Sequence, residues 1–426
     1  MVASASILVN APSEVELQPE VDSRVIHFEH DDQPLPVVDV QPLINAAQLV
    51  YTPDSDVNTV SVDVMAIVGT TASAITIDPN IFYDSELLAI IHRSKAKSSG
   101  LVATKVWAWQ GIKSKLGESE ERKLQELARR YNTSLIVTKQ FGEPSELVYT
   151  LGGQLAIRQG IRAHWSSENT AMHLVRAFGG VTYIDELDLS IKNLCSGFSY
   201  CISLLQTFYV WHGRGATDVE RHAALKYAQS LAPSASDIIE LVEGESDEDE
   251  MFWLILGEGE YAKADYWRWK ATSDHWQARI WMVNGDQADS VLLPLASISN
   301  AVSPHSHIFI LDCVWEYFVL VGSEARGKRK DIRIALNVAS ETATKIASSR
   351  PYSPTVHVLI LPSQLPADLR LAFRDFDETQ LNQGLTPDHL NLLPVSLAKD
   401  HLQQTLWQRD LLTDSTILPL GLDVPQ

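Results

Sequence analysis

The chain has 426 residues, a formal net charge of −20 at pH 7 and a 45% share of hydrophobic residues. This length predicts about two to four domains of ordinary globular composition. The negative charge argues against a binder of duplex nucleic acid, which needs a basic face, and no run of about 18 apolar residues predicts a membrane span. The 3 cysteines are too few for a disulfide framework, so we expect free thiols in a reducing compartment.

The N-terminal third of the chain divides into a tail and a first unit. Residues 1–38 lack sustained periodicity, and we expect a flexible tail with one strand at residues 23–28. Residues 39–153 have the pattern of strands followed by a charged helix that ends at Tyr131, a further strand and a glycine stop at residues 152–153. The earlier strands are expected over residues 60–69, 73–78, 84–93 and 106–111.

Residues 154–272 repeat this organisation. A pair of strands is expected to turn at Gly179, and a hairpin over residues 197–213 leads into an amphipathic helix that ends at Leu231. The next strand, over residues 236–244, runs into an acidic loop that we interpret as solvent-facing, because blocks of like charge usually are.

Residues 273–385 form the third predicted unit. A hairpin, a glycine turn and a helix recur there before a strand at residues 357–362. Residues 386–426 are expected to be a C-terminal tail with a short helix over residues 401–412.

The three units share one element, in which a strand ends in a glycine turn and continues into an amphipathic helix. Its clearest copy covers residues 208–231. The aligned glycines, Gly111, Gly213 and Gly322, are 102 and 109 residues apart. A period near 100 residues predicts tandem whole domains, and the mixture of helix and strand predicts a sheet covered by helices in each.

Within the second copy, YVWHGRGATDVERHAALKYAQSL resembles the core signature of gelsolin-like repeats, as found in gelsolin, villin, severin and fragmin. HIFILD resembles the strand before that signature, and LGEGEYAKADYWRWK resembles the end of such a repeat. The resemblance covers about residues 45–380. It implies an α/β (α+β) fold of three tandem gelsolin-like domains, the severin and fragmin arrangement, each with a mixed central sheet flanked by a long and a short helix.

The resemblance also implies a partner and a place in the cell. We expect a cytoplasmic, monomeric protein of the cytoskeleton that binds actin, as filament or monomer, and severs or caps filaments. The basic residues expected to contact acidic actin are Arg214, Arg221 and Lys226 in the second unit, and Arg122 and Lys123 in the first. The basic run GKRKD at residues 327–331 raises the possibility of a phosphoinositide headgroup as a second partner.

Gelsolin-like repeats typically bind calcium through a carboxylate just before the central strand, a neighbouring backbone carbonyl and a glutamate in the long helix. This set suits Ca²⁺, which takes six to eight oxygen ligands. In the first unit, Glu86 fits the strand position and either Glu120 or Glu121 fits the helix position.

The other two units depart from this pattern. In the second unit Glu220 falls at the helix glutamate, but Phe198 occupies the strand position. In the third unit His307 and Asp331 occupy the two positions, and histidine is a poor calcium ligand. The candidate calcium ligands are therefore Glu86, Glu121 and Glu220. One retained site and calcium-independent binding both fit these observations.

We find no catalytic constellation in the sequence and expect no enzyme. His212 lies in the glycine turn without a serine or cysteine in a nucleophile context, and Asp185 belongs to a group of acids of the kind that is commonly solvated. Cys195 and Cys201 flank a strand and are interpreted as core thiols. The alternative to an actin binder is a non-enzymatic scaffold or adaptor that uses gelsolin-like domains for protein–protein interaction without severing actin.

Overall fold

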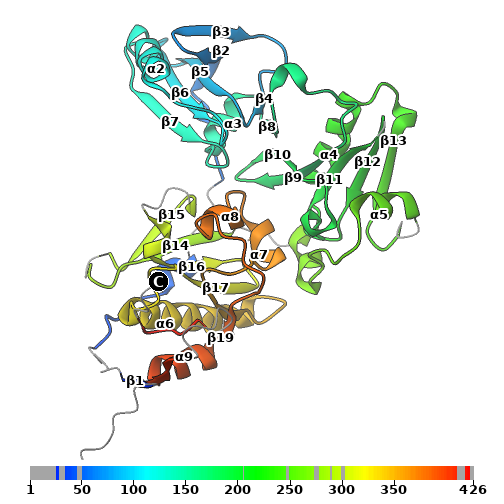
Figure 1. Ribbon diagram of the computed structural model, residues 1–426. Coiled ribbons are helices and arrows are strands. Elements are labelled where there is room, and N and C mark those ends of the chain that lie inside the picture. The colour runs from blue at the N-terminus through cyan, green and yellow to red at the C-terminus, as the bar shows by residue number, and fades with distance from the viewer. Residues whose placement is uncertain are drawn as a thin grey trace, which may run out of the picture.

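The computed structural model describes residues 25–27, 34–45, 50–204, 206–245, 249–272, 278–287, 290–298, 303–409 and 418–422. These residues form three large sheets and one two-stranded sheet, and the large sheets build three lobes (Figure 1). The predicted fold class of mixed sheets flanked by helices is confirmed. Within the described ranges, no helix is both long and apolar enough to cross a membrane.

The first sheet has the strand order β3-β2-β5-β6-β7. Its strands are β2 (Val57–Val68), β3 (Thr71–Ile75), β5 (Leu87–Ala96), β6 (Val102–Gln110) and β7 (Leu135–Lys139). Strands β6 and β7 run parallel, because the long helix α2 (Glu118–Arg130) carries the chain back across the sheet between them. The short helix α3 (Ser145–Thr150) follows.

The second sheet has the order β13-β12-β11-β9-β10-β8-β4. Its strands are β4 (Ile81–Tyr83), β8 (Gln154–Arg158), β9 (Ala171–Phe178), β10 (Val181–Leu187), β11 (Ser199–Leu204), β12 (Thr207–His212) and β13 (Ile238–Val242). The parallel pair here is β12 and β13, joined by the long helix α4 (Asp218–Leu231). The short helices α5 (Glu250–Leu256) and η4 (Asp265–Thr272) come after β13.

Strand β4 ties the first lobe to the second. It lies within the range predicted for the first unit, yet it pairs in parallel with β8 at the edge of the second sheet. The predicted unit boundaries at residues 153 and 272 therefore stay predictions.

The third sheet has the order β15-β14-β16-β17-β18-β19. Its strands are β14 (Arg279–Val283), β15 (Leu292–Leu295), β16 (Ile308–Asp312), β17 (Glu316–Val321), β18 (Thr355–Ile360) and β19 (Leu392–Pro394). The long helix α6 (Arg329–Ile346) joins the parallel strands β17 and β18. The short helices α7 (Ala367–Ala372) and α8 (Glu378–Leu381) follow.

Each large sheet has a long helix on one face and a shorter helix on the other, because alternate side chains of a strand point to opposite faces. In the second lobe, Ala224 and Tyr227 of α4 pack with Val210 of β12. Phe252 of α5 packs on the opposite face with Trp211. This division of the core repeats in the first and third lobes, which confirms the predicted pairing of long and short helices.

The glycine after β6, β12 and β17 has the same surroundings in every lobe. A Cβ atom on Gly213 would lie 2.3 Å from the carbonyl oxygen of Ser196, and the Gly213 N–H donates to the Phe198 carbonyl at 3.0 Å. The corresponding Cβ distances are 2.3 Å to Asp84 for Gly111 and 2.2 Å to His305 for Gly322. The aligned glycines of the sequence thus mark one turn built three times, in which no side chain fits.

Segments from both ends of the described chain pack on the third lobe. Strand β1 (Val25–His27) pairs antiparallel with β20 (Leu406–Gln408). Val40, just before helix α1 (Gln41–Asn45), is 0% exposed in the core that α6 covers. Leu35 and Val38, which the sequence assigns to a flexible tail, pack against the same core.

The C-terminal helix lies earlier than predicted. It is α9 (Val395–Gln403), so the predicted range of residues 401–412 begins at the end of α9 and continues into β20, with its last three residues outside the described part. Ala398 and Leu402, four residues apart, point the same way and are buried in the core of the third lobe. The helix of the predicted tail is therefore part of that lobe.

Candidate functional site

The first turn of each long helix carries a carboxylate that is bonded to the backbone at or just beyond the end of a strand. These carboxylate oxygens accept backbone N–H groups at 2.8, 3.0 and 2.8 Å, in the pairs Glu120 with Gly69, Glu220 with Ala177, and Asp331 with Gly285. In the first lobe the structure thus places Glu120 at the helix position and leaves Glu121 exposed on α2. The candidate Glu121 is corrected accordingly: the loop before α2 shifts the register by one residue.

Glu220 is buried and paired with a lysine. Lys270 of η4 donates to Oε1 and Oε2 of Glu220 at 2.7 and 2.6 Å and to the carbonyl oxygen of Gly197 at 2.8 Å. Glu220 also closes a capping box at the start of α4, since its Oε2 accepts the Thr217 N–H at 2.9 Å. The predicted calcium ligand is therefore bound by a cation of the chain itself.

The environment of this pair is almost dry. The side chains of Lys270 and Glu220 are 1% and 0% exposed. Burial lowers the pKa of Lys270, and the charge and hydrogen bonds of Glu220 act in the opposite direction. The ring of Phe198 faces the ammonium group, with 4.4 Å from Nζ to the ring centroid. Sequence analysis missed Lys270 because its segment, YWRWK, has the composition of a packing element.

Glu86 also binds a basic side chain. Its Oε1 and Oε2 accept from Nε and Nη2 of Arg162 at 2.7 and 2.9 Å, and Oε2 also accepts the Tyr83 N–H at 3.1 Å. Glu120 is bonded to Gly69 instead. Within the described ranges, no group of three or more His, Cys, Asp or Glu side chains could hold a metal ion. Glu86 and Glu120 are thus each bonded to other groups of the chain, and a calcium site in the first lobe stays a prediction.

The third lobe has a lysine near the corresponding strand start. Ser306 lies two residues before β16, as Gly197 lies two residues before β11, and its carbonyl accepts from Lys328 Nζ at 2.7 Å. His307 places Nδ1 2.9 Å from the Ser303 carbonyl oxygen. At the strand position of the third lobe, His307 and the Ser306 carbonyl therefore bond to groups of the chain itself.

The predicted actin contacts of the first lobe lie on α2. Arg122 has a 78% exposed side chain and lies 3.9 Å from Glu118. Lys123 is 20% exposed and pairs with Glu126 at 3.0 Å. Arg122 is thus accessible to a partner, whereas Lys123 is largely held against its own helix.

The predicted contacts of the second lobe lie on the turn and on α4. Arg214 and Lys226 are exposed. Arg221 is half-buried and donates to the carbonyl oxygens of Ala216 and Gly213 at 3.2 and 3.4 Å. Arg221 therefore stabilises the glycine turn, and of the three predicted contacts Arg214 and Lys226 face solvent.

His212 has a serine neighbour that the sequence pattern did not reveal. Its Nδ1 lies 2.9 Å from Ser199 Oγ, and its Nε2 lies 3.0 Å from Glu240 Oε1. The sequence predicts no serine or cysteine in a nucleophile context here, yet the order of these three groups resembles a nucleophile, base and orienting acid. Ser199 is 0% exposed, however, and burial lowers the pKa of His212. Because the Ser199 hydroxyl is buried, we interpret Ser199, His212 and Glu240 as a structural chain of hydrogen bonds.

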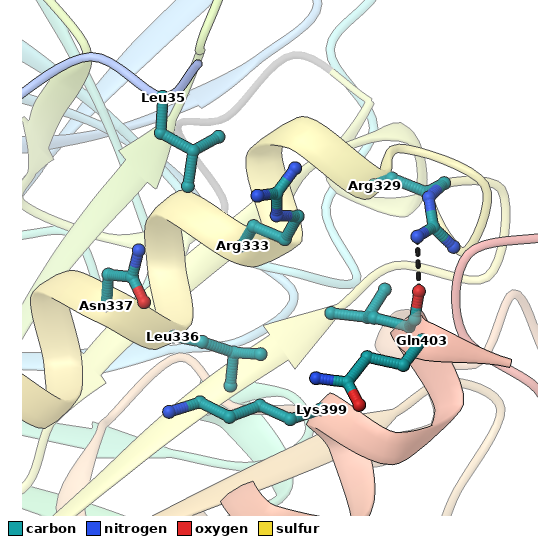
Figure 2. Close-up of a pocket in the computed structure, with 8 residues that line it drawn as sticks. Leu35, Arg329, Arg333, Leu336, Asn337, Lys399 and Gln403 are labelled. Atoms are coloured by element: carbon teal, nitrogen blue, oxygen red, sulfur yellow. Dashed lines mark hydrogen bonds between the residues drawn. The ribbon is translucent and has the colours of Figure 1, made fainter. Parts of the chain in front are cut away.

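A cavity of about 540 Å³ lies between α6 and α9 (Figure 2). Arg329 and Arg333 of α6 and Lys399 of α9 line it, and no acidic residue does so within the described part of the chain. The remaining lining residues are Leu35, Leu336, Asn337, Leu402 and Gln403. This arrangement is suited to an anionic ligand.

The basic run predicted to bind phosphoinositides is split by the structure. Only Arg329 of this run lines the cavity, and it donates to the Leu402 carbonyl. Lys328 is bonded to Ser306, and Lys330 pairs with Asp286 at 3.3 Å. The run therefore does not act as one continuous patch.

Two curated proteins that are similar to the chain are both gelsolins. No family model matches the chain. Gelsolin of Xenopus laevis is 26% identical over 272 residues, which cover 60% of this chain and 62% of that protein. Cytoplasmic gelsolin of Halocynthia roretzi is 25% identical over 243 residues, 54% of this chain and 33% of that protein. The chain thus spans less than two thirds of each relative.

One solved structure is also similar in part. A Thorarchaeota 2DGel3 in complex with rabbit actin matches over 45% of this chain and 98% of its own, at 17% identity and a TM-score of 0.19. That score is too low to support an argument on the fold. The two sequence relatives confirm the predicted resemblance to gelsolins.

Proposed function

We propose that this protein is a non-enzymatic, cytoplasmic actin-binding protein of the gelsolin type. The observation that carries the proposal is the similarity to two gelsolins in a chain that builds the same glycine turn, parallel strand pair and long helix three times. Tandem copies of one module on one chain provide several contact surfaces, which suits a partner that is itself a repeating filament.

We infer that contact with actin begins at the exposed surface of the first lobe. The face of α2 that points to solvent is charged, and α2 has the buried residues Leu124, Leu127 and Ala128 on its inner face. Two apolar side chains of the preceding loop, Ile112 and Leu116, are 48% and 43% exposed. Helix-in-groove recognition needs apolar anchors, and this loop supplies them beside the charged helix.

Co-sedimentation with filamentous actin tests the proposal. The full chain is centrifuged with and without filaments, in calcium and in chelator, and we expect it to pellet with actin in both conditions. Absence of pelleting in both would contradict the proposal and favour the scaffold alternative. Severing and capping are then separated by following filament length and barbed-end growth under the microscope.

The cavity between α6 and α9 supports a second, anionic ligand. Three basic side chains on two helices line a space large enough for a phosphorylated headgroup, and guanidinium groups bind phosphate in a bidentate manner. A phosphoinositide headgroup is the ligand of this class that we propose, and the corresponding experiment is given in the Discussion.

A further inference from the structure

The Glu220 site in the second lobe is complete without a metal ion. Four hydrogen bonds reach its two carboxylate oxygens, one each from the Ala177 N–H and the Thr217 N–H, and two from Lys270 Nζ. The ammonium group of Lys270 makes its further bond to the Gly197 carbonyl. A lysine ammonium has three donors and no acceptor, so these three oxygens satisfy it.

The oxygens that Lys270 binds are two of the three ligand types that calcium would need here. The resemblance implies a helix glutamate, a backbone carbonyl beside the strand position and a strand carboxylate. Glu220 and the Gly197 carbonyl are present, and both bind Lys270 Nζ. The strand position holds Phe198, whose ring faces the ammonium group and offers no oxygen to a metal. The residues fit an organic cation with aromatic contact and do not fit Ca²⁺.

The segment that carries Lys270 is fixed against this site. A Cβ atom on Gly197 would lie 2.3 Å from the ring of Trp267, and one on Gly215 would lie 2.0 Å from the Trp267 carbonyl oxygen. Trp267 is 1% exposed. These two glycines leave room for η4 to pack directly on the turn, so the lysine is held in place by its own backbone.

We propose that Lys270 replaces a calcium ion in the second lobe as a cation built into the chain. The ammonium group ties η4 to the start of α4 and to the residue before β11, which is the task that a bound ion would perform. The lobe therefore keeps η4, α4 and the start of β11 tied together at any calcium concentration. This proposal concerns the lobe itself and does not depend on actin binding.

The other lobes place basic side chains at related positions. Arg162 binds both oxygens of Glu86 at the strand position of the first lobe. Lys328 binds the Ser306 carbonyl, the counterpart of Gly197, in the third. In each lobe, a basic side chain of the protein thus binds an oxygen that would be a calcium ligand in the implied pattern. Only Lys270 reaches two of the ligand groups at once, so the second lobe gives the sharpest test.

The test is thermal unfolding of the full chain in 1 mM Ca²⁺, in 1 mM Mg²⁺ and in chelator. We expect the Tm of the unaltered protein to be the same in all three. Lys270→Ala removes the ammonium group and leaves the Glu220 carboxylate buried without its cation. We therefore expect the Tm of this variant in chelator to be lower than that of the unaltered protein. Lys270→Ala combined with Phe198→Asp restores a second carboxylate, and calcium should raise the Tm of this double variant by several degrees, with Mg²⁺ having a smaller effect.

Two further variants keep the test decisive. Lys270→Met with Glu220→Gln removes both charges and should fold without any response to calcium. If Lys270→Ala does not fold in chelator, its refolding yield from denaturant with and without calcium replaces the Tm as the measurement. A calcium-dependent rise in the Tm of the unaltered protein that Glu220→Gln abolishes would overturn the proposal. So would a folded double variant with Phe198→Asp that does not respond to calcium.

Discussion

Arg374 forms a bidentate ion pair with Asp185, with Nε and Nη2 at 2.9 and 2.8 Å from its two carboxylate oxygens. The third nitrogen, Nη1, lies 2.8 Å from Glu143 Oε2, and the guanidinium lies 3.9 Å from the ring centroid of Tyr183. Burial lowers the pKa of Arg374, but Asp185 and Glu143 outweigh it and raise the pKa overall, so the group stays charged. Arg374 follows α7, Asp185 is in β10 and Glu143 precedes α3, so one side chain joins all three lobes.

Arg374→Ala should therefore weaken the junction between the lobes. It leaves Asp185 and Glu143 buried, with 1% and 0% of their side chains exposed, and removes their cation. Breaking a buried pair in this way costs about 3–5 kcal/mol, so we expect a lower urea midpoint and a larger radius of gyration in small-angle scattering. Lys345→Ala, which removes an exposed pair on α6, is the matched control and should change the stability by less than about 1 kcal/mol. Equal effects of the two variants would contradict this role of Arg374.

Gly213→Ala should unfold the second lobe at a lower denaturant concentration. The added Cβ would lie 2.3 Å from the Ser196 carbonyl oxygen, which is backbone and cannot move aside cheaply. We expect a loss of more than about 3 kcal/mol in the free energy of unfolding, measured by chemical denaturation. Gly142→Ala is the control, since its Cβ would lie 3.4 Å from the nearest atom, the Lys139 carbonyl oxygen. A Gly213→Ala protein as stable as this control would disprove the steric requirement of the turn.

His173 should make the stability of the second lobe depend on pH. Burial, with Arg158 as the second cause, lowers the pKa of its imidazole from 6.5 to about 3. The folded chain therefore holds His173 neutral, and its contribution is fully present above pH 6.5. As the pH falls from about 6.5 to about 3, the unfolded chain takes up a proton that the folded chain refuses. The free energy of unfolding then declines by about 1.4 kcal/mol per pH unit.

Denaturation curves of His173→Gln between pH 7 and pH 4 check this expectation. The variant should have a shallower pH dependence than the unaltered protein by the equivalent of one proton. His222→Gln, on the exposed side of α4, should leave the slope unchanged. A slope that stays the same in His173→Gln would show that other groups cause the acid sensitivity.

The sequence was sufficient to predict the repeated strand, glycine turn and helix, but not the side chains that pair with residues of these elements. The three glycines could be aligned because a close backbone approach excludes every side chain, which leaves a local signal in each copy. The partner of Glu220 could not be found in this way, since Lys270 lies 50 residues further along the chain. Arg374 lies 189 residues from Asp185. Pairings at such separations depend on how elements pack, which local periodicity does not report.

The same reason explains the smaller differences. The sequence leaves Glu120 and Glu121 both possible at the helix position because a longer loop precedes α2, and the hydrogen bond to Gly69 identifies Glu120 in place of the candidate Glu121. The sequence predicts the C-terminal helix too late because residues 401–412 are rich in apolar and helix-forming residues. The core of the third lobe selects Ala398 and Leu402 instead. Tertiary packing thus decides among segments of similar local preference.

The cavity between α6 and α9 should bind phosphoinositide headgroups. We expect the protein to co-float with vesicles that contain phosphatidylinositol 4,5-bisphosphate, and much less with vesicles of equal charge made with phosphatidylserine. Arg333→Gln with Lys399→Gln removes two of the lining charges and should reduce binding about tenfold or more. Lys345→Gln, at the far end of α6, is the control. Equal binding to both vesicle types would indicate a general charge effect, and no binding to either would contradict the site.

Two exposed basic residues of the second lobe, Arg214 and Lys226, should contribute to actin binding. Arg214 and Lys226 are exposed, so their replacement by Glu reverses two surface charges. Arg221 is left unchanged because it donates to two carbonyl oxygens of the glycine turn. Co-sedimentation of the Arg214→Glu and Lys226→Glu double variant should show about tenfold weaker affinity at low salt, and the difference should shrink at high salt, since exposed charges are screened. Lys345→Glu reverses one exposed charge in the third lobe and should bind as the unaltered protein does. If the double variant pellets like the unaltered protein at low salt, this face of the second lobe does not contact the filament.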